Sequence, residues 1–264
     1  MIDLAVPASG IKLNRSVQRV VSILRALAEA KPSLGLSEVS TAVELPESTV
    51  YRMLATLQGE GFVERTPDGS GRYQLGLEVF RLGSSVLKRL GIGQESLSYL
   101  EALAEETHET VNLGALHGFH VLYLQKVESQ HPLRASLTVG SATVPAHCSA
   151  NGKALLAHLA EDELTALLDE HSLSRRGPNT ITDRATLLKE LARIRAQGFS
   201  VDDLEFAADI RAVAAPIRDH HGEVIAAVAI AAPATRLSRE RAYELAPRIV
   251  EAARHISTRL GHWS

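Results

Sequence analysis

The sequence predicts an α+β protein built in two parts. Three short helical periodicities open the chain, a hairpin pattern of strand-forming residues follows them, and the remainder interleaves helical segments with further strands. Helices combined in this way with an antiparallel or mixed sheet are typical of α+β domains. A length of 264 residues suits two domains of ordinary size. We therefore expect an N-terminal domain at 14–76, a linker helix at 77–94 and a larger domain at 95–264.

The composition excludes several classes of protein. Hydrophobic residues make up 45% and charged residues 22%, which is ordinary for a soluble globular chain. No run reaches the roughly 18 apolar residues of a bilayer span, and no secretion leader is recognisable. The single cysteine, Cys148, cannot form an internal disulfide. These features predict a cytoplasmic protein without membrane contact. The net charge of −3 argues against an indiscriminately basic nucleic-acid binder but permits a site-specific one with local positive charge.

The first domain begins with three helices whose apolar residues recur every three or four positions. We expect the first helix to start at the cap Ser16 and to stop at Pro32, and the second to start at the cap Ser37. The third runs from about Glu47 to Gln58 and is stopped by glycines. The residues expected to face inward are Val17, Val20, Val21, Leu24, Leu27 and Ala28 in the first helix, Leu36, Val39, Ala42 and Val43 in the second, and Val50, Met53, Leu54 and Leu57 in the third.

A tight turn separates the second and third helices, and two strands at 62–65 and 72–75 follow around a loop rich in turn residues. This order predicts a winged helix-turn-helix. The third helix would present a polar reading face formed by Ser48, Thr49, Tyr51, Arg52 and Thr56. Such a face is also compatible with ordinary solvation. Because it carries one cation only, we expect each copy to bind double-stranded DNA weakly and the protein to act as a dimer or tetramer. The candidate phosphate contacts are Arg15, Arg19, Arg65 and Arg72.

The larger domain alternates both kinds of element. Helical spacing covers 77–90, 95–107, 161–169, 187–198 and 239–260, with a kink expected at Pro247, and a further helix starts at Ser149 or Asn151 and reaches Leu159. The expected strands are 110–116, 121–127, 199–202, 212–217 and 224–231.

The candidate chemistry in this domain favours binding over catalysis. Cys148 follows His147, but adjacent side chains rarely point at each other and no third partner is evident, so no catalytic residue is predicted. No histidine lies in a cluster with zinc spacing, and no cofactor is expected. A metal held by Cys148 or His147 with distant ligands stays open. The polar helix start at 148–152 favours an anion such as a carboxylate, because free N–H groups and the helix dipole point outward there.

Several blocks of the sequence resemble the IclR family of bacterial regulators. In the first domain they are Ser16-Val17-Gln18-Arg19, the run from Leu45 to Leu54, Gly61-Phe62-Val63-Glu64 and Arg72-Tyr73-Gln74-Leu75-Gly76. In the second they are Val127-Glu128-Ser129, the run from Pro145 to Ala154, Asn179-Thr180-Ile181-Thr182-Asp183 and Val213-Ala214-Ala215-Pro216-Ile217. The resemblance implies a non-enzymatic regulator with a GAF-like effector-binding domain, in which Leu82 to Leu90 contributes to a dimer contact.

The same resemblance places a small-molecule pocket in the second domain. It implies the effector-binding residues Gly140, Ala146, His147, Cys148, Ser149, Ala150, Asn151, Gly152, Asp202, Ala212, Ala229 and Ala231. Several relatives carry Cys or Ser where this chain has Ala212, Ala229 and Ala231. These departures make the pocket roomier and less polar, and they favour a larger organic acid, such as an aromatic one, over a very small keto acid. Ordinary strand packing is the alternative for the three alanines. The rival functions are a DNA-binding scaffold that only oligomerises and a small-molecule enzyme.

Overall fold

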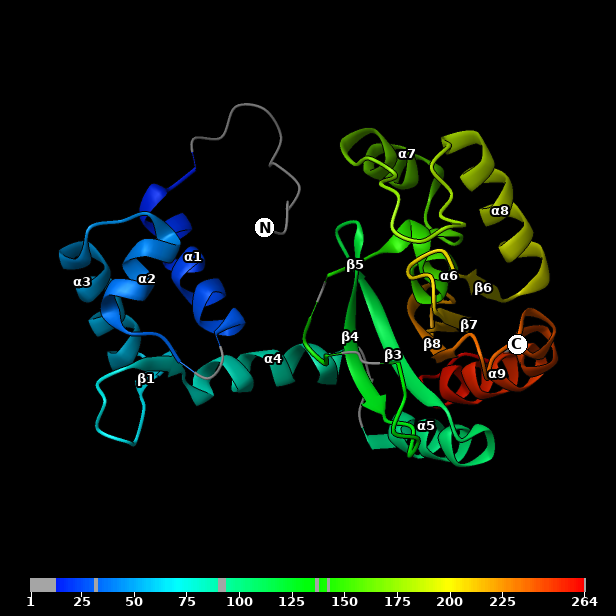
Figure 1. Cartoon of the computed structure of the whole chain (residues 1–264), viewed down its shortest axis with the longest axis horizontal. Coiled ribbons are helices and arrows are strands. Elements are labelled where there is room, and N and C mark those ends of the chain that lie inside the picture. Colours follow the sequence, from blue (N-terminus) through cyan, green and yellow to red (C-terminus); the bar gives the residue numbers. More distant parts are fainter. Residues whose placement is uncertain (1–12, 31–32, 90–93, 136–137, 142, 264) are drawn as a thin grey trace. The chain divides into compact units, whose positions relative to one another are not determined.

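A computed structural model describes residues 13–30, 33–89, 94–135, 138–141 and 143–263. The chain divides into two compact units, one ending at Arg89 and the other formed by the residues after it. Each unit has its own core, so each is described separately (Figure 1).

The N-terminal unit has three helices, a two-stranded hairpin and a long closing helix. They are α1 (Arg15–Glu29), α2 (Leu36–Val43), α3 (Glu47–Gly59), β1 (Val63–Arg65), β2 (Tyr73–Leu75) and α4 (Leu77–Arg89). β1 and β2 pair antiparallel, with Glu64 opposite Gln74. The isolated bridge between Leu34 and Tyr73 ties the hairpin to the start of α2. The winged helix-turn-helix expected from the sequence is therefore present.

Several local predictions in this unit are wrong. The side chain of Asn14, not that of Ser16, accepts hydrogen bonds at the start of α1, and Gly35 rather than Ser37 stands at the cap position of α2. The expected inward stripe of α1 is also rotated, because Ile23 is fully buried while Val17 and Val21 are exposed. Ala28 of α1 and Ala42 of α2 are exposed as well. Pro32, the expected stop of the first helix, lies outside the described residues.

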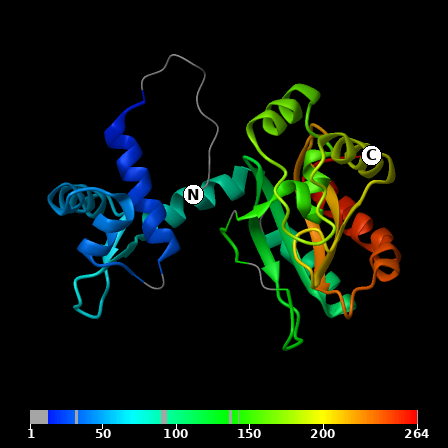
Figure 2. The ribbon, with the colours of Figure 1, turned by 45° about the horizontal axis from the view of Figure 1, so that its top comes forward.

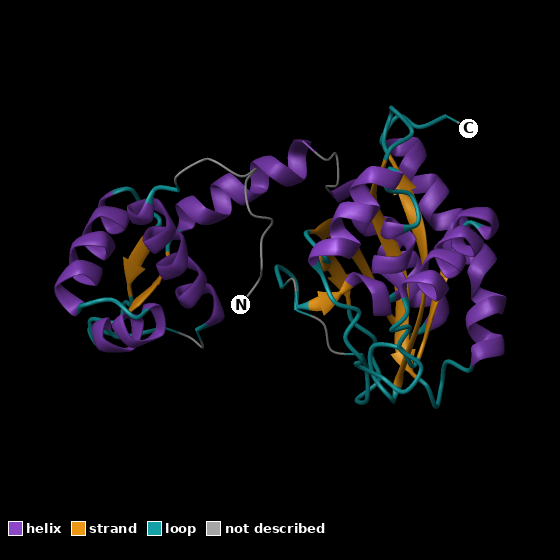
Figure 3. Cartoon of the chain, turned by 90° about the horizontal axis from the view of Figure 1, so that it is seen from above, coloured by secondary structure: helices purple, strands orange, loops and turns teal. Residues whose placement is uncertain are grey.

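The C-terminal unit contains one antiparallel sheet of six strands in the order β5-β4-β3-β8-β7-β6. The strands are β3 (Thr110–His117), β4 (His120–Val127), β5 (Val144–Pro145), β6 (Ser200–Asp203), β7 (Ile210–Arg218) and β8 (Val224–Pro233). The helices are α5 (Gln94–Thr107), the 3-10 turn η1 (Ala146–Cys148), α6 (Ala150–Leu156), α7 (Glu161–Glu170), α8 (Arg184–Gln197) and α9 (Arg239–Arg259). Figures 2 and 3 show helices on both sides of this sheet.

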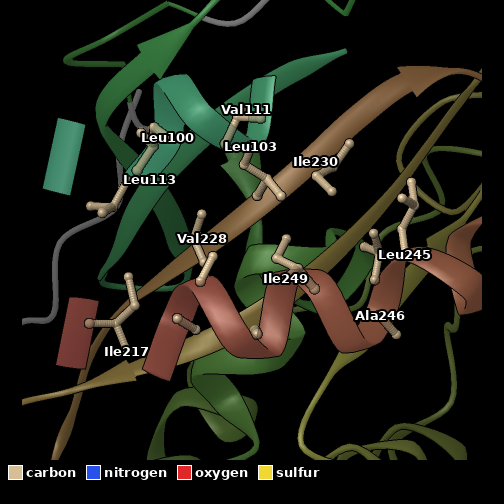
Figure 4. Packing of buried hydrophobic residues seen from close by; sticks show 14 of the residues in the cluster. Leu100, Leu103, Val111, Leu113, Ile217, Val228, Ile230, Leu245, Ala246 and Ile249 are labelled. Atoms are coloured by element: carbon tan, nitrogen blue, oxygen red, sulfur yellow. The ribbon is translucent and has the colours of Figure 1, made fainter. Parts of the chain in front are cut away.

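The two faces of the sheet differ in side-chain size. One face carries large aliphatic residues that pack against α5 and α9; Val111, Val228 and Ile230 lie there with Leu100 of α5 and Ile249 of α9 (Figure 4). The other face lies against α6 and is built largely of alanine. Because strand residues alternate between faces, the large residues of β7 and β8 pack into the core on one side of the sheet, and the alanines between them form the other side.

The expected α+β class is confirmed, and the observed strands overlap those expected from the sequence. The short strand β5 and the turn η1 were not expected. α9 continues through Pro247, as the expected helix does. Residues 90–93, which include the expected interruption of the linker helix, are outside the described part, as are the side chains of 86–90 that were expected at a dimer contact. Among the residues the structure describes, no helix combines the length and the apolar character that a bilayer span requires.

Candidate DNA-reading face and effector site

The turn between α2 and α3 sets the direction of the third helix. Glu44 adopts a left-handed conformation with φ of 53°, which reverses the chain within a few residues. The Leu45 N–H donates to the Ser40 carbonyl at 3.1 Å, and the Ser40 hydroxyl donates back to the Leu45 carbonyl at 2.5 Å. These bonds fix the angle at which α3 leaves the turn.

The predicted reading face lies on the outside of α3. Val50, Leu54 and Leu57 hold the helix in the core. The candidate residues Ser48, Tyr51, Arg52 and Thr56 are exposed, and Thr49 is half-buried. The Thr56 hydroxyl donates to the Arg52 carbonyl at 3.0 Å, so it is partly satisfied within the helix. The Arg52 side chain has no hydrogen-bond partner or ion pair among the described residues, which leaves its guanidinium available to a ligand.

The four other candidate arginines differ from one another in whether their side chains have a partner within the unit. Arg15 and Arg19 of α1 are exposed. Arg72 instead donates through Nε to the Ser33 hydroxyl at 3.1 Å and through Nη2 to Glu38 at 2.6 Å, and so ties the wing to the start of α2. Arg65 donates to the Tyr73 hydroxyl at 2.8 Å and stacks over the Tyr73 ring at 4.7 Å. The contacts of these two arginines indicate a structural role in bracing the wing.

The loop of the wing has an acidic tip. Asp68 accepts hydrogen bonds from the Thr66 and Ser70 side chains and from the Ser70 N–H. These bonds lower the pKa of the Asp68 carboxyl to about 2. A permanently charged carboxylate at this position is unfavourable next to phosphate. Among the described candidate arginines, those without a partner in the unit therefore lie on α1 and α3 rather than at the tip of the wing.

In the C-terminal unit, the three alanines singled out from the sequence lie on one face of the sheet. Ala212 of β7 is opposite Ala231 of β8, and Ala229 is opposite Ala214 in the same ladder. Asp202 of β6 is opposite Ala212, so its side chain is on this face too. Ala229 is fully buried, whereas Ala212 and Ala231 keep 7% and 5% of their surface although they lie in interior strands. All three alanines are therefore buried, and Ala229 is the most completely covered of them. We call the face formed by Asp202, Ala212, Ala229 and Ala231 the alanine face.

The start of α6 adjoins the alanine face. Ser149 caps the helix: its hydroxyl accepts from the Gly152 N–H at 3.2 Å and donates to the Pro145 carbonyl at 3.2 Å. Gly152 is required here, because a Cβ would stand 2.3 Å from the Cα of Ala146. The Gly152 N–H is therefore not free for a ligand. The N–H groups of Ala150 and Asn151 remain as the candidate donors of this turn.

Two buried polar side chains at this site have strongly raised pKa values. Asp202 is 2% exposed, and burial together with the nearby Glu205 carboxyl raises its pKa to about 7. Its Oδ1 accepts the backbone N–H groups of Glu205 and Phe206 at 2.8 and 3.3 Å. Burial also raises the pKa of the Tyr123 hydroxyl, and the nearby Asp202 and Cys148 raise that pKa further. Asp202 is thus a mixture of neutral and charged forms near neutral pH.

Cys148 and His147 do not form a catalytic pair. Burial raises the pKa of the Cys148 thiol to about 12, and the thiol donates to the Pro145 carbonyl at 3.5 Å. The His147 ring stacks on Phe119, and its Nε2 is 3.1 Å from the Ser174 carbonyl. Phe119 belongs to the apolar cluster between α6, α7 and α8, so His147 lies with that cluster rather than on the alanine face. Among the described residues no group of His, Cys, Asp and Glu could hold a metal ion.

The remaining candidates are distributed unevenly. Ala150 packs with the alanine face, and Ala146 packs beneath α6. Gly140 lies in an exposed turn, where its N–H donates to the Tyr123 carbonyl at 2.8 Å. The structure therefore brings the first turn of α6 together with the alanine face, leaves Ala146 and His147 with the apolar cluster on the other side of that helix, and leaves Gly140 at the periphery.

Sequence reasoning missed a buried charge beneath this site. Lys153 is 1% exposed, donates to the Val201 carbonyl at 2.7 Å and forms an ion pair with Glu205, while Glu190 lies at 3.8 Å. The apolar run after Lys153 gave no sign of this pairing. Asn112 was also missed, although a polar residue between Val111 and Leu113 in a strand with both faces covered was a detectable signal.

A winged helix-turn-helix joined to a separate α+β unit defines the class of ligand-controlled DNA-binding regulators, and comparison with known proteins agrees. The model of the IclR helix-turn-helix domain matches residues 16–67, and that of the bacterial transcriptional regulator IclR C-terminal domain matches 84–258. The chain belongs to the IclR family. It binds DNA through the helix-turn-helix, carries a C-terminal effector-binding domain and, as a member of a non-enzymatic family, is a regulator rather than an enzyme.

Relatives match over nearly the whole chain. The transcriptional regulator BhcR of Paracoccus denitrificans is 35% identical over 92% of this chain and 86% of its own length. The transcriptional repressor IclR of Escherichia coli is 33% identical over 97% and 92%. Among solved structures, an IclR homologue of Microbacterium hydrocarbonoxydans complexed with 4-hydroxybenzoate is 28% identical, with a TM-score of 0.81 over 92% and 98% of the two chains.

Proposed function

We propose that this regulator is controlled by a small organic acid bound on the alanine face, with its carboxylate toward the 148–152 segment. The observation that carries the proposal is the low wall of Ala212, Ala229 and Ala231 beside the polar start of α6. Small side chains on one wall leave room for the apolar body of a ligand, while a few polar groups orient it.

The electrostatics of the site favour a singly charged acid. A carboxylate facing an ionised Asp202 would be repelled, but the raised pKa of that carboxyl keeps a large fraction of it neutral near pH 7. A neutral carboxyl donates a hydrogen bond to an anion. The N–H groups of Ala150 and Asn151 add two further donors. The relative complexed with 4-hydroxybenzoate, an aromatic carboxylate, supports this class of ligand.

Self-association completes the proposed mechanism. The N-terminal unit exposes large apolar side chains on α1 and α4, namely Val17, Val21, Leu77, Phe80 and Leu82. Exposed apolar residues gathered on two helices are typical of association surfaces. A dimer or tetramer would present two reading helices to an imperfect palindrome, and the effector would change their spacing. Such a protein works where the chromosome is, in the cytoplasm.

The test combines a ligand screen with one wall substitution. In a thermal-shift screen of organic acids, a ligand that binds the folded state raises the melting temperature by mass action. Ala231→Leu adds bulk to the proposed wall of the site and should weaken the best acid about tenfold or more, because one leucine fills the space of several ligand atoms. Ala192→Leu, on the exposed side of α8, is the matched control.

Calorimetry decides the outcome. Unchanged affinity in Ala231→Leu would show that the ligand does not bind on the alanine face. A screen in which no acid raises the melting temperature would contradict the proposed ligand class. Sedimentation at micromolar concentration should show a dimer or tetramer; a monomer that binds its operator tightly would contradict the proposed assembly.

A further inference from the structure

Asn112 is a buried asparagine with no hydrogen-bond partner among the residues that the structure describes. It is 1% exposed, and its buried Oδ1 accepts no hydrogen bond from that part of the chain. No described residue bonds to its side-chain Nδ2 either. Leaving a buried amide unsatisfied costs stability, so native proteins rarely retain one without a reason.

The register places this side chain beside the proposed ligand. Asn112 of β3 is opposite Ala229 of β8, so the two side chains share the alanine face. On the same strand, Thr110 is opposite Ala231 and its hydroxyl accepts from the Ser129 N–H at 3.2 Å. Of these two polar neighbours, Thr110 has hydrogen-bond partners among the described residues and Asn112 has none.

Asn151 provides the internal comparison. It is also buried, at 3% exposed, and it lies at the start of α6 near the same face. Its Nδ2 donates to the Ala227 carbonyl at 2.9 Å. A buried asparagine in this domain is therefore able to find a backbone partner, whereas the amide of Asn112, unpaired among the described residues, faces the small side chains of the alanine face.

We propose that the Asn112 amide recognises a hydroxyl group of the effector, so that the site selects hydroxylated acids over their parent acids. The inference rests on the proposed function. A hydroxyl is at once a donor and an acceptor, so it satisfies Oδ1 by donating and can accept from Nδ2. A carboxylate only accepts, and it would leave Oδ1 unpaired. The carboxylate is thus held at the α6 side and the hydroxyl at the β3 side.

The binding test uses matched probes on the full-length protein. Benzoate is compared with 2-, 3- and 4-hydroxybenzoate, and butyrate with 2-, 3- and 4-hydroxybutyrate, by calorimetry. In the parent protein one hydroxylated isomer should bind about tenfold or more tightly than its parent acid, because the parent leaves the amide unpaired. Asn112→Leu removes the amide at similar volume and should reduce that preference below about twofold, while the parent acid keeps its affinity within about threefold.

A second measurement needs no ligand. Because the Asn112 amide is unpaired, Asn112→Leu should leave the melting temperature of the unliganded protein unchanged or higher, whereas Asn151→Leu should lower it by breaking a buried hydrogen bond. A marked loss of stability in Asn112→Leu would overturn the inference by showing a structural partner.

The outcomes separate the two levels of the proposal. If the acids bind but the hydroxylated and parent forms bind equally, or if Asn112→Leu keeps the preference, the role of Asn112 is wrong and the acid-binding site stands. If none of the probes binds and Asn112→Leu is destabilised, both are wrong. If none binds while the stability result holds, the carboxylate class fails, and the hydroxyl inference that rests on it is rejected with it.

Discussion

The reading face of α3 and the alanine face of the sheet use polar groups in opposite ways. On α3 the polar side chains are exposed and Arg52 has no partner within the described chain. In the C-terminal unit the charges of Lys153, Asp202 and Glu205 are buried and interact with one another. Exposed charges are screened by water and contribute little to folding, whereas buried charges depend on their partners. Substitutions on the first face should therefore change DNA affinity, and substitutions at the second should change stability and its pH dependence.

The largest effect should come from Lys153→Met. Removing the ammonium leaves Glu205 buried without its counter-charge, and breaking a buried pair in this way costs about 3 to 5 kcal/mol. Thermal unfolding of the full chain should show a clear drop in the melting temperature of the C-terminal unit. The double variant Lys153→Met with Glu205→Gln should recover part of the loss. Equal stability of the single variant and the parent would show that the pair is not buried.

Arg52→Ala should weaken operator binding by about 1 to 3 kcal/mol, because a guanidinium contact to guanine or phosphate is lost. The melting temperature should not change, since the side chain is exposed and has no partner among the described residues. A gel-shift titration with a genomic fragment chosen by selection measures the affinity. Arg254→Ala, exposed on α9, is the control. Unchanged affinity in Arg52→Ala would contradict the placement of α3 in the DNA groove.

Asp202→Asn should raise stability by about 1 kcal/mol or more at pH 8, since it removes a charge whose burial is unfavourable. The unfolded carboxyl has a pKa of about 4, and the folded one is raised to about 7. The folded protein thus binds more protons in this window, and the stability that this group contributes falls as the pH rises through it.

Comparing melting temperatures of variant and parent from pH 5 to 8 isolates this effect from that of the half-buried His120 and the buried His147, whose lowered pKa values act in the opposite direction. Asparagine keeps the acceptor for the two backbone N–H groups. A difference between variant and parent that is the same at pH 5 and pH 8 would show that Asp202 titrates normally.

The smallest effect should come from the turn before the reading helix. Glu44→Gly relieves a side chain held at φ of 53°, and such a change stabilises by about 0.5 to 1 kcal/mol when the native conformation suits glycine. Chemical unfolding of the N-terminal unit measures it. Glu60→Gly, at a negative φ of −91° beyond α3, is the control and should not stabilise. A loss of stability in Glu44→Gly would mean that the Glu44 side chain makes a contact that outweighs the strain.

Sequence patterns were enough for the helix-turn-helix, the wing and most strands, because each pattern is local. Apolar spacing in α3 and alternation in β3 and β4 report which face of a single element is buried. The same patterns predicted a buried face of α1 that is rotated about the helix axis from the observed one. Ile23 and Val17 are both strongly apolar, and only the packing of α2 and the hairpin against α1 decides which of them is buried.

The partners of polar groups were decided by the tertiary structure. Arg72, a predicted phosphate contact, bonds to Ser33, 39 residues away, and Lys153 reaches Glu205 across 52 residues. The unpaired state of Asn112 depends on which strand lies beside β3 and on the alanines that strand carries. Periodicity records which way a side chain points along its own element, whereas a hydrogen bond or ion pair depends on what another element places opposite it, and that is determined only when the chain has folded.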